Sequence, residues 1–364
     1  MSLGDWFRRA LGRKSEAPLS SQAPEQHRIG LPPTPTAELG QPKGPYMLGR
    51  YRVVDEIGVG STASVHLARM DGPGGFQKWV AIKRLHPHLA KDDELVQMFL
   101  DEARIGAGIL HENVVRVFDL GKDDNTYWIA MEYLHGELLR EVMRCAEERG
   151  LRLTSELAAR ICSDAAEGLH AAHELRRKNG QLLGLVHRDV TPHNLFLTYD
   201  GHAKLFDFGT TKVADRLSST RPGMLKGTLA YMSPEQVRGA ELDRTTDIFS
   251  LGVVLWELTT NQRLFWMDTD LDTLEKVQAC VVPPPSSIVK DYPIELESVV
   301  MKALAKRRQD RFQTARELSD ALRKFLVPRT ASAGPEEVAQ FVHQVFADQI
   351  QKRDAHLASA AEET

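Results

Sequence analysis

The stretch His187-Arg188-Asp189-Val190-Thr191-Pro192-His193-Asn194, followed by Asp207-Phe208-Gly209, decides how this chain is interpreted. Two carboxylates and an amide at this spacing are typical of a site that transfers a phosphoryl group from Mg·ATP. In such a site Asp189 accepts the proton of the substrate hydroxyl, and Asn194 and Asp207 hold the Mg²⁺ ions. Thr191 is unusual, because a lysine is usual at that position. The stretch therefore predicts phosphoryl transfer and leaves a question about its rate.

The overall composition is that of an ordinary globular protein. The 364 residues allow one large domain or two modest ones, with 42% hydrophobic and 26% charged residues. A formal net charge of −4 offers no basic field for a nucleic-acid partner. The three cysteines match no C-x-x-C pattern, which favours a reduced, cytoplasmic compartment over a disulfide framework or a zinc site.

The sequence predicts no transmembrane helix, because no stretch reaches the roughly 18 consecutive apolar residues that a span requires. Residues 1–14 nevertheless form a candidate amphipathic docking helix, with basic residues beside an apolar face. This helix would contact a membrane surface or a partner protein; a frayed tail is the alternative. Its apolar positions are Leu3, Trp6, Phe7, Ala10 and Leu11.

The composition along the chain predicts a linker, a sheet-rich half and a larger helical half. Residues 15–48 are rich in Pro, Gln and Ser and are expected to be a disordered linker. The expected strands are 51–57, 64–68, 79–83, 114–118 and 127–132, with a helix over 92–108. The later expected helices are 137–148, 154–177, 246–260, 294–305 and 314–326.

A separate amphipathic helix is predicted over 335–357. Pro335, Glu336 and Glu337 suit a first helical turn, and the apolar residues that follow fall on one face. A helix packed back on the domain is the favoured interpretation. A docking helix for a partner or for a second copy of the chain is the alternative.

Two further motifs suit nucleotide binding. Gly58 and Gly60 lie between the first two strands, where glycines let backbone N–H groups close over phosphates, although a simple glycine hairpin has the same pattern. The strand Val80-Ala81-Ile82-Lys83 carries a lysine that needs a carboxylate partner if buried. Glu102 is the best candidate partner, and Asp101 is the alternative.

The segment Tyr127–Gly136 resembles a strand that runs into a hinge between the two halves. Backbone groups at Glu132 and Leu134 would contact an adenine edge, with Met131 at the back of the pocket. Each of the residues expected to sandwich the ring could equally be a core residue: Ile57, Val65, Ala81 and Phe196.

These motifs, in this order, resemble those of the eukaryotic-like (Hanks-type) serine/threonine protein kinases of bacteria. The resemblance covers residues 49–327. It implies an α+β, bilobal protein-kinase fold, with a small antiparallel-sheet N-lobe at 49–132 that has one helix, and a larger helical C-lobe at 135–327. The other carriers of the resemblance are Gly227-Thr228-x-x-Tyr231-Met232-Ser233-Pro234-Glu235, Asp247 and Arg311-Phe312.

The resemblance also implies roles for single residues. Lys83 would bind the α- and β-phosphates of ATP and pair with Glu102. Asp247 would brace the catalytic loop, and Glu235 and Arg311 would form a buried ion pair. His187 and Phe208 would stack in a hydrophobic spine, in which Gly106 takes the place of a larger residue and would hold its helix more loosely.

Regulation is expected in the activation segment between Asp207 and Glu235. In the family, an arginine at the position of Arg188 commonly contacts a phosphate on this segment. Autophosphorylation is predicted in the Ser218–Thr220 cluster, because basic side chains surround it. The candidate hydroxyls are Ser218, Ser219, Thr220 and Thr228.

The sequence thus predicts a protein kinase that uses ATP and Mg²⁺ to phosphorylate Ser or Thr of protein substrates in bacterial signalling. One alternative is a pseudokinase scaffold that binds ATP without efficient transfer and whose function is carried by the terminal helices. A small-molecule phosphotransferase is the other, and the complete substrate platform at 227–235 argues against it.

Overall fold

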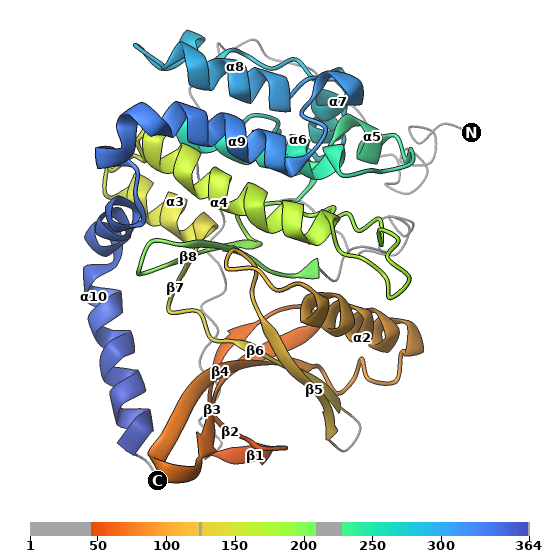
Figure 1. Ribbon diagram of the computed structural model, residues 1–364, viewed down its shortest axis with the longest axis vertical. Helices are drawn as coiled ribbons and strands as arrows, with labels where there is room; N and C mark the ends of the chain where they lie inside the picture. Colours follow the sequence, from red (N-terminus) through yellow and green to blue (C-terminus); the bar gives the residue numbers. More distant parts are fainter. Residues whose placement is uncertain (1–44, 124–125, 209–227, 363–364) are drawn as a thin grey trace, which may run out of the picture.

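The computed structural model describes residues 45–123, 126–208 and 228–362. These residues form a small lobe built on a sheet and a larger lobe built of helices (Figure 1), and the chain passes between them through a hinge at residues 133–135. This is the bilobal α+β fold that the sequence predicts.

The small lobe is a six-stranded antiparallel sheet in the order β1-β2-β3-β4-β6-β5. Apolar side chains from its central strands, among them Val53, Val80 and Ala130, are buried together and form one of the lobe's two small cores. The strands are β1 (Tyr46–Leu48), β2 (Tyr51–Val59), β3 (Ala63–Gly72), β4 (Phe76–Leu85), β5 (Val117–Asp123) and β6 (Thr126–Glu132).

One helix, α2 (Asp93–Gly108), packs against this sheet. Asp92 starts the helix, because its side chain accepts hydrogen bonds from the N–H groups of Glu94 and Leu95. Phe99 and Ala103 on its inner face join a second apolar cluster with sheet residues. The position of α2 therefore follows from an N-cap and one apolar face.

The large lobe is built around α4 and α6, which pack against each other, with α9 against α4 and α8 against α6. A short sheet of β7 (Gly136–Leu138), β8 (Leu195–Thr198) and β9 (Ala203–Leu205) lies beside the hinge. The helices are α3 (Leu139–Glu148), α4 (Ser155–His173), α5 (Pro234–Val237), α6 (Thr245–Thr260), α7 (Asp270–Ala279), α8 (Ile294–Ala303), α9 (Ala315–Leu326) and α10 (Pro335–Glu362), with 3₁₀ turns at Pro73–Gly75, Leu229–Tyr231, Pro285–Ser287, Arg308–Asp310 and Val327–Ser332.

Several predicted boundaries are wrong. The predicted linker ends too late, because β1 already pairs with β2 at residues 46–48. The strand expected over 114–118 is displaced to β5, because pairing with β6 selects Val117–Asp123 in spite of its polar composition. The helix expected from 137 begins after β7, the helix expected to reach 177 ends at His173, and α7 was not predicted.

The helix predicted over 335–357 is α10, which continues to Glu362. Its apolar residues Val338, Val342 and Val345 are fully buried in the core of the large lobe. Figure 1 shows α10 leaving this lobe and running along one side of the molecule toward the small lobe.

Candidate active site

Lys83 and Glu102 form an ion pair between the sheet and α2. The Lys83 Nζ lies 2.6 and 2.8 Å from the two carboxylate oxygens of Glu102 and 3.7 Å from Asp207 Oδ1. Burial alone would lower the pKa of Lys83, but the carboxylates of Asp207 and Glu102 outweigh it and raise that pKa. Lys83 therefore stays charged, and the structure pairs it with Glu102 rather than with Asp101.

The loop that carries Asp189 is held from below by Asp247, a fully buried residue of α6. Asp247 accepts hydrogen bonds from the backbone N–H groups of His187 and Arg188, both at 2.8 Å. Burial alone would raise the pKa of Asp247, but its hydrogen bond with His173 Nε2, at 2.7 Å, and its other donors lower it. Arg188 has a φ of 69°, a left-handed conformation that these contacts maintain.

Asp189 is oriented by Asn194. The Asn194 Nδ2 donates to Asp189 Oδ2 at 2.7 Å and to the Asp189 carbonyl at 2.9 Å. The other carboxylate oxygen, Asp189 Oδ1, is buried and has no hydrogen-bond partner within the described part of the chain. Burial raises the pKa of Asp189. One oxygen is thus fixed and the other can accept a substrate proton.

The predicted spine contact is present. The rings of His187 and Phe208 have centroids 4.7 Å apart. At Gly106, a Cβ would lie 2.6 Å from Val117 Cγ2, so the Val117 side chain of β5 fills the space that a larger residue at 106 would need. A neighbouring strand therefore compensates for the glycine.

Thr191 is 1% exposed, and its hydroxyl accepts a hydrogen bond from the His193 N–H at 3.2 Å. Its carbonyl accepts a second one from the Asn194 N–H at 3.0 Å. Thr191 thus supports the turn that positions Asn194, a role the sequence does not reveal.

The candidate nucleotide residues lie on adjacent strands at the hinge. In the register of the sheet, Gly58 on β2 lies opposite Val65 on β3, and Ala81 on β4 lies opposite Met131 on β6. Phe196 on β8 pairs with Leu138 on β7, and Leu134 lies in the hinge between β6 and β7. Ile57 on β2 is 46% exposed.

The glycine turn is closed by its own backbone. The Gly60 N–H donates to the Ala63 carbonyl at 2.8 Å, and His86 Nε2 lies 2.9 Å from the Gly60 carbonyl oxygen. A Cβ on Gly60 would lie 3.2 Å from the Ala63 oxygen. The tight turn therefore needs a small residue at position 60, whereas Ala63 replaces the third glycine of the usual pattern without strain.

The donor set fits Mg²⁺. Asn194 and Asp207 offer oxygen ligands, which this ion prefers, and Mg²⁺ usually takes only one or two carboxylates besides phosphate and water. No group of three or more His, Cys, Asp or Glu residues suited to a metal is found in the described ranges. The fit is therefore to a metal bound together with phosphates, and a structural zinc is not indicated.

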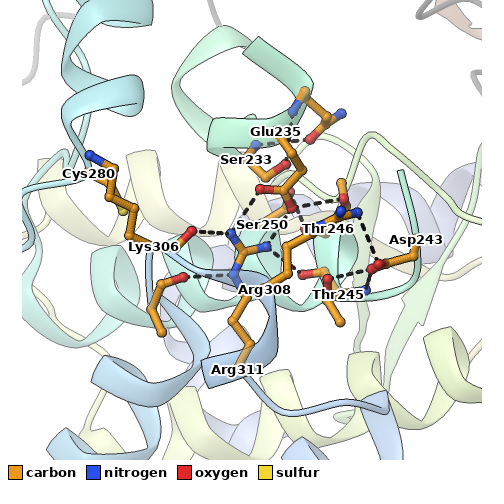
Figure 2. Close-up of polar contacts among 12 residues, drawn as sticks. Ser233, Glu235, Asp243, Thr245, Thr246, Ser250, Cys280, Lys306, Arg308 and Arg311 are labelled. Atoms are coloured by element: carbon orange, nitrogen blue, oxygen red, sulfur yellow. Dashed lines mark hydrogen bonds and ion pairs between the residues drawn. The ribbon is translucent and has the colours of Figure 1, made fainter. Parts of the chain in front are cut away.

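Below the site, Glu235 and Arg311 form a buried pair (Figure 2). The Arg311 nitrogens lie 2.6 and 2.9 Å from the two Glu235 oxygens, and both side chains are at most 2% exposed. Arg311 also donates to the carbonyls of Thr245, Ala305 and Lys306. Burial alone would raise the pKa of Glu235, but Arg311 lowers it. This network joins α5, α6 and the segment before α9.

Some predicted features lie outside the described residues, namely residues 1–44, Gly209, Gly227 and the hydroxyls Ser218, Ser219 and Thr220. Thr228 is described, and its carbonyl accepts from the Tyr231 N–H at 3.0 Å. Within the described ranges, no helix is long and apolar enough to cross a membrane. All three cysteines are free thiols.

Sequence reasoning missed three supporting residues. His173 on α4 is 1% exposed, and its Nε2 is hydrogen-bonded to Asp247. Gln236 Nε2 donates to the Arg188 carbonyl at 2.8 Å, which ties the substrate platform to the catalytic loop. Lys204 pairs with Glu132 at 2.9 Å across the hinge. The position of Gln236, directly after Glu235 of the platform, was the one signal that could have identified it.

Comparisons with known proteins place the chain among its relatives. Residues 51–356 match the family model of the protein kinase domain. The chain is 39% identical over 327 residues to the tyrosine-protein kinase MasK of Myxococcus xanthus, covering 90% of this chain and 50% of that protein. It is 33% identical over 279 residues to the serine/threonine-protein kinase PknB of Mycobacterium leprae, covering 75% and 42%.

A solved structure, the PknI kinase domain of Mycobacterium tuberculosis, matches with a TM-score of 0.56 and 28% identity. The match covers 77% of this chain and 97% of that domain. The chain spans half or less of the length of the curated relatives named above. With the fold, the family match and these identities in agreement, the chain belongs to the protein kinase family, among its bacterial Hanks-type members.

Proposed function

We propose that this chain transfers the γ-phosphate of ATP to Ser or Thr hydroxyls of protein substrates, with Mg²⁺ bound by Asn194 and Asp207. The observation that carries this proposal is the state of Asp189. Asn194 fixes one of its oxygens, and the other is buried without a partner among the described residues. A pseudokinase scaffold would not need to keep such an oxygen available.

The chain's own groups supply each part of the reaction. The Lys83 ammonium, held by Glu102, suits binding of the α- and β-phosphates. Asp189 Oδ1 suits acceptance of the proton from the substrate hydroxyl, and its pKa, raised by burial, makes it a better base than an exposed aspartate. Bound Mg²⁺ would neutralise phosphate charge as the bond breaks. Protein kinases use ATP and Mg²⁺ and act on protein substrates, and the residues here suit both.

The acceptor residue needs its own argument, because MasK is named a tyrosine kinase and PknB a serine/threonine kinase. We favour Ser and Thr because the sequence of the platform at 227–235 resembles the Ser/Thr type. Its described part is rigidly held: the Tyr231 hydroxyl lies 2.7 Å from Glu257 Oε2, and Glu235 is paired with Arg311.

The free thiols support a reduced, cytoplasmic location.

A transfer assay tests the proposal. The chain is incubated with Mg²⁺, radiolabelled ATP and a generic protein acceptor, and the labelled amino acids are separated after acid hydrolysis. We expect phosphoserine and phosphothreonine, and none with Asp189→Ala. Phosphotyrosine alone would contradict the proposed acceptor. ATP binding without any transfer would support the scaffold alternative, and label confined to small alcohols would support a small-molecule phosphotransferase.

The same labelled protein tests regulation. We propose that autophosphorylation occurs in the Ser218–Thr220 cluster and that Arg188 contacts the new phosphate. Mass spectrometry of peptides from active protein should find phosphate on this cluster. A bare cluster in fully active protein would exclude the idea. Contacts of residues 1–14 with a membrane or partner stay a prediction.

We expect Thr191→Lys to raise turnover, because a lysine at this position can bond the γ-phosphate, and losing one such donor costs roughly 10²–10³ in rate. Steady-state kcat is the measurement. Thr191→Val is the matched control: it keeps the shape but removes the hydroxyl that accepts from His193. An unchanged or lower kcat in Thr191→Lys, together with a loss in Thr191→Val, would show that the site depends on the threonine turn instead.

A further inference from the structure

The helix α10 consists of two segments that differ in how they are held. At Phe346 the backbone leaves the helical conformation, with φ −124° and ψ 23°. The first segment, up to Val345, buries apolar side chains in the large lobe. It also lies so close to the β8–β9 turn that a Cβ on Gly201 would collide with the Pro335 carbonyl oxygen. This segment is a permanent part of the large lobe.

The second segment, residues 347–362, crosses the hinge. Arg353 Nη1 donates to the Gly136 carbonyl at 2.6 Å, and Arg353 Nη2 lies 3.0 Å from a carboxylate oxygen of Glu137. The neighbouring residue Asp354 also contacts the hinge, since its Oδ1 lies 3.1 Å from His135 Nε2. His135, Gly136 and Glu137 directly follow Leu134, the candidate adenine-binding residue of the hinge.

The end of the helix is bound by the small lobe. Arg69 on β3 is only 2% exposed, and its Nη1 donates to the carbonyls of Ala360 and Ala361 at 3.1 and 2.9 Å. A cation at this place also complements the negative end of the helix dipole. On β2, Asp55 Oδ2 lies 3.4 Å from His356 Nε2. The helix thus joins both lobes and the hinge (Figure 1).

The second segment is held mainly by polar contacts. Its first turn still buries Ile350 in the core of the large lobe, but between residues 351 and 361 only Ala360 is buried, and Gln351, Lys352 and Asp354 are exposed. A segment with so little apolar burial can detach without unfolding the lobe beneath it. In the structure the segment is attached while the Lys83–Glu102 pair is formed. Attachment therefore accompanies the assembled site, which argues against an inhibitory strap.

We propose that residues 347–362 act as a strap that fixes the hinge and the relative orientation of the lobes for nucleotide binding. Arg353 and Arg69 are its positioning residues: Arg353 orders the hinge backbone next to Leu134, and Arg69 anchors the strap to the sheet above the nucleotide. Neither touches a reacting atom. Loss of the strap disorders the nucleotide-binding site but leaves Asp189 in place. Losing the strap therefore raises KM for ATP and changes kcat little.

The test compares Arg353→Ala with Arg353→Lys and with Lys352→Ala, a control at the exposed neighbouring position. We expect Arg353→Ala to raise KM for ATP about tenfold, the lower limit for loss of a charge-assisted hydrogen bond, with kcat changed less than about twofold. Arg353→Lys should restore part of the affinity, and Lys352→Ala should resemble the wild type. Unchanged KM in Arg353→Ala would overturn the proposal.

The kinetic measurement rests on the proposed kinase activity, so a second measurement is independent of it. Hydrogen exchange of the nucleotide-free full chain should be faster at residues 133–138 in Arg353→Ala, with an unchanged melting temperature. A chain that ends at Ile350 should show the same faster exchange and the same raised KM. Exchange equal to that of the wild type in both variants, or a lower KM in the shortened chain, would refute the strap.

Discussion

Replacing Asp189 with Asn is expected to lower kcat by roughly 10²–10⁴, the usual contribution of a positioned general base. The substitution keeps the size of the side chain and its contact with Asn194 but removes the basic oxygen. The affinity for ATP should change little, because the phosphates are expected at Lys83. Single-turnover transfer and calorimetric ATP binding measure the two quantities separately.

The pH dependence sharpens this result. Because burial raises the pKa of Asp189, the wild-type rate should fall on the acid side with a midpoint above that of an ordinary aspartate. The residual rate of Asp189→Asn should lack this acid limb. Asp320→Asn, at an exposed position on α9, is the matched control and should leave both rate and pH profile unchanged. A wild-type rate in Asp189→Asn would refute the role of Asp189.

The largest expected effect on stability comes from Glu235→Ala. This change leaves the Arg311 guanidinium buried without its carboxylate, and breaking a buried pair in this way costs about 3–5 kcal/mol. The hydrogen bond from the Thr246 hydroxyl to Glu235 is lost as well. Denaturant unfolding, followed by circular dichroism, measures the change in the free energy of unfolding.

An exposed pair in the same region provides the control. Arg307 and Asp310 lie 2.6 Å apart but are 71% and 43% exposed. Asp310→Ala should therefore cost far less stability than Glu235→Ala, because solvent screens an exposed pair. The lowered pKa of Glu235 also sets the direction of the pH dependence of stability. The pair stabilises the folded protein fully above the ordinary glutamate pKa, and this stabilisation is lost as pH falls through the lower pKa of the folded state. Equal losses in Glu235→Ala and Asp310→Ala would contradict this account of the buried pair.

The sequence predicted the site better than the boundaries of the elements. Lys83 and Glu102 belong to motifs whose order along the chain is specific, so the ion pair that they form was expected. The strand β5, predicted at the wrong residues, and the helix α7, not predicted at all, show where local sequence fails to predict the elements. Their local composition is polar, and pairing or packing with distant segments decides their conformation.

The sequence by itself determined the family, the candidate catalytic residues and the amphipathic face of α10, because each depends on residue types at fixed spacing. Only the tertiary structure decided what depends on contacts between distant segments. Val117 fills the space at Gly106, Thr191 supports the catalytic turn, and His173 holds Asp247. The contact of Arg69 with the end of α10 joins residues 291 positions apart. No local pattern encodes such a contact, since it forms only when both lobes have folded.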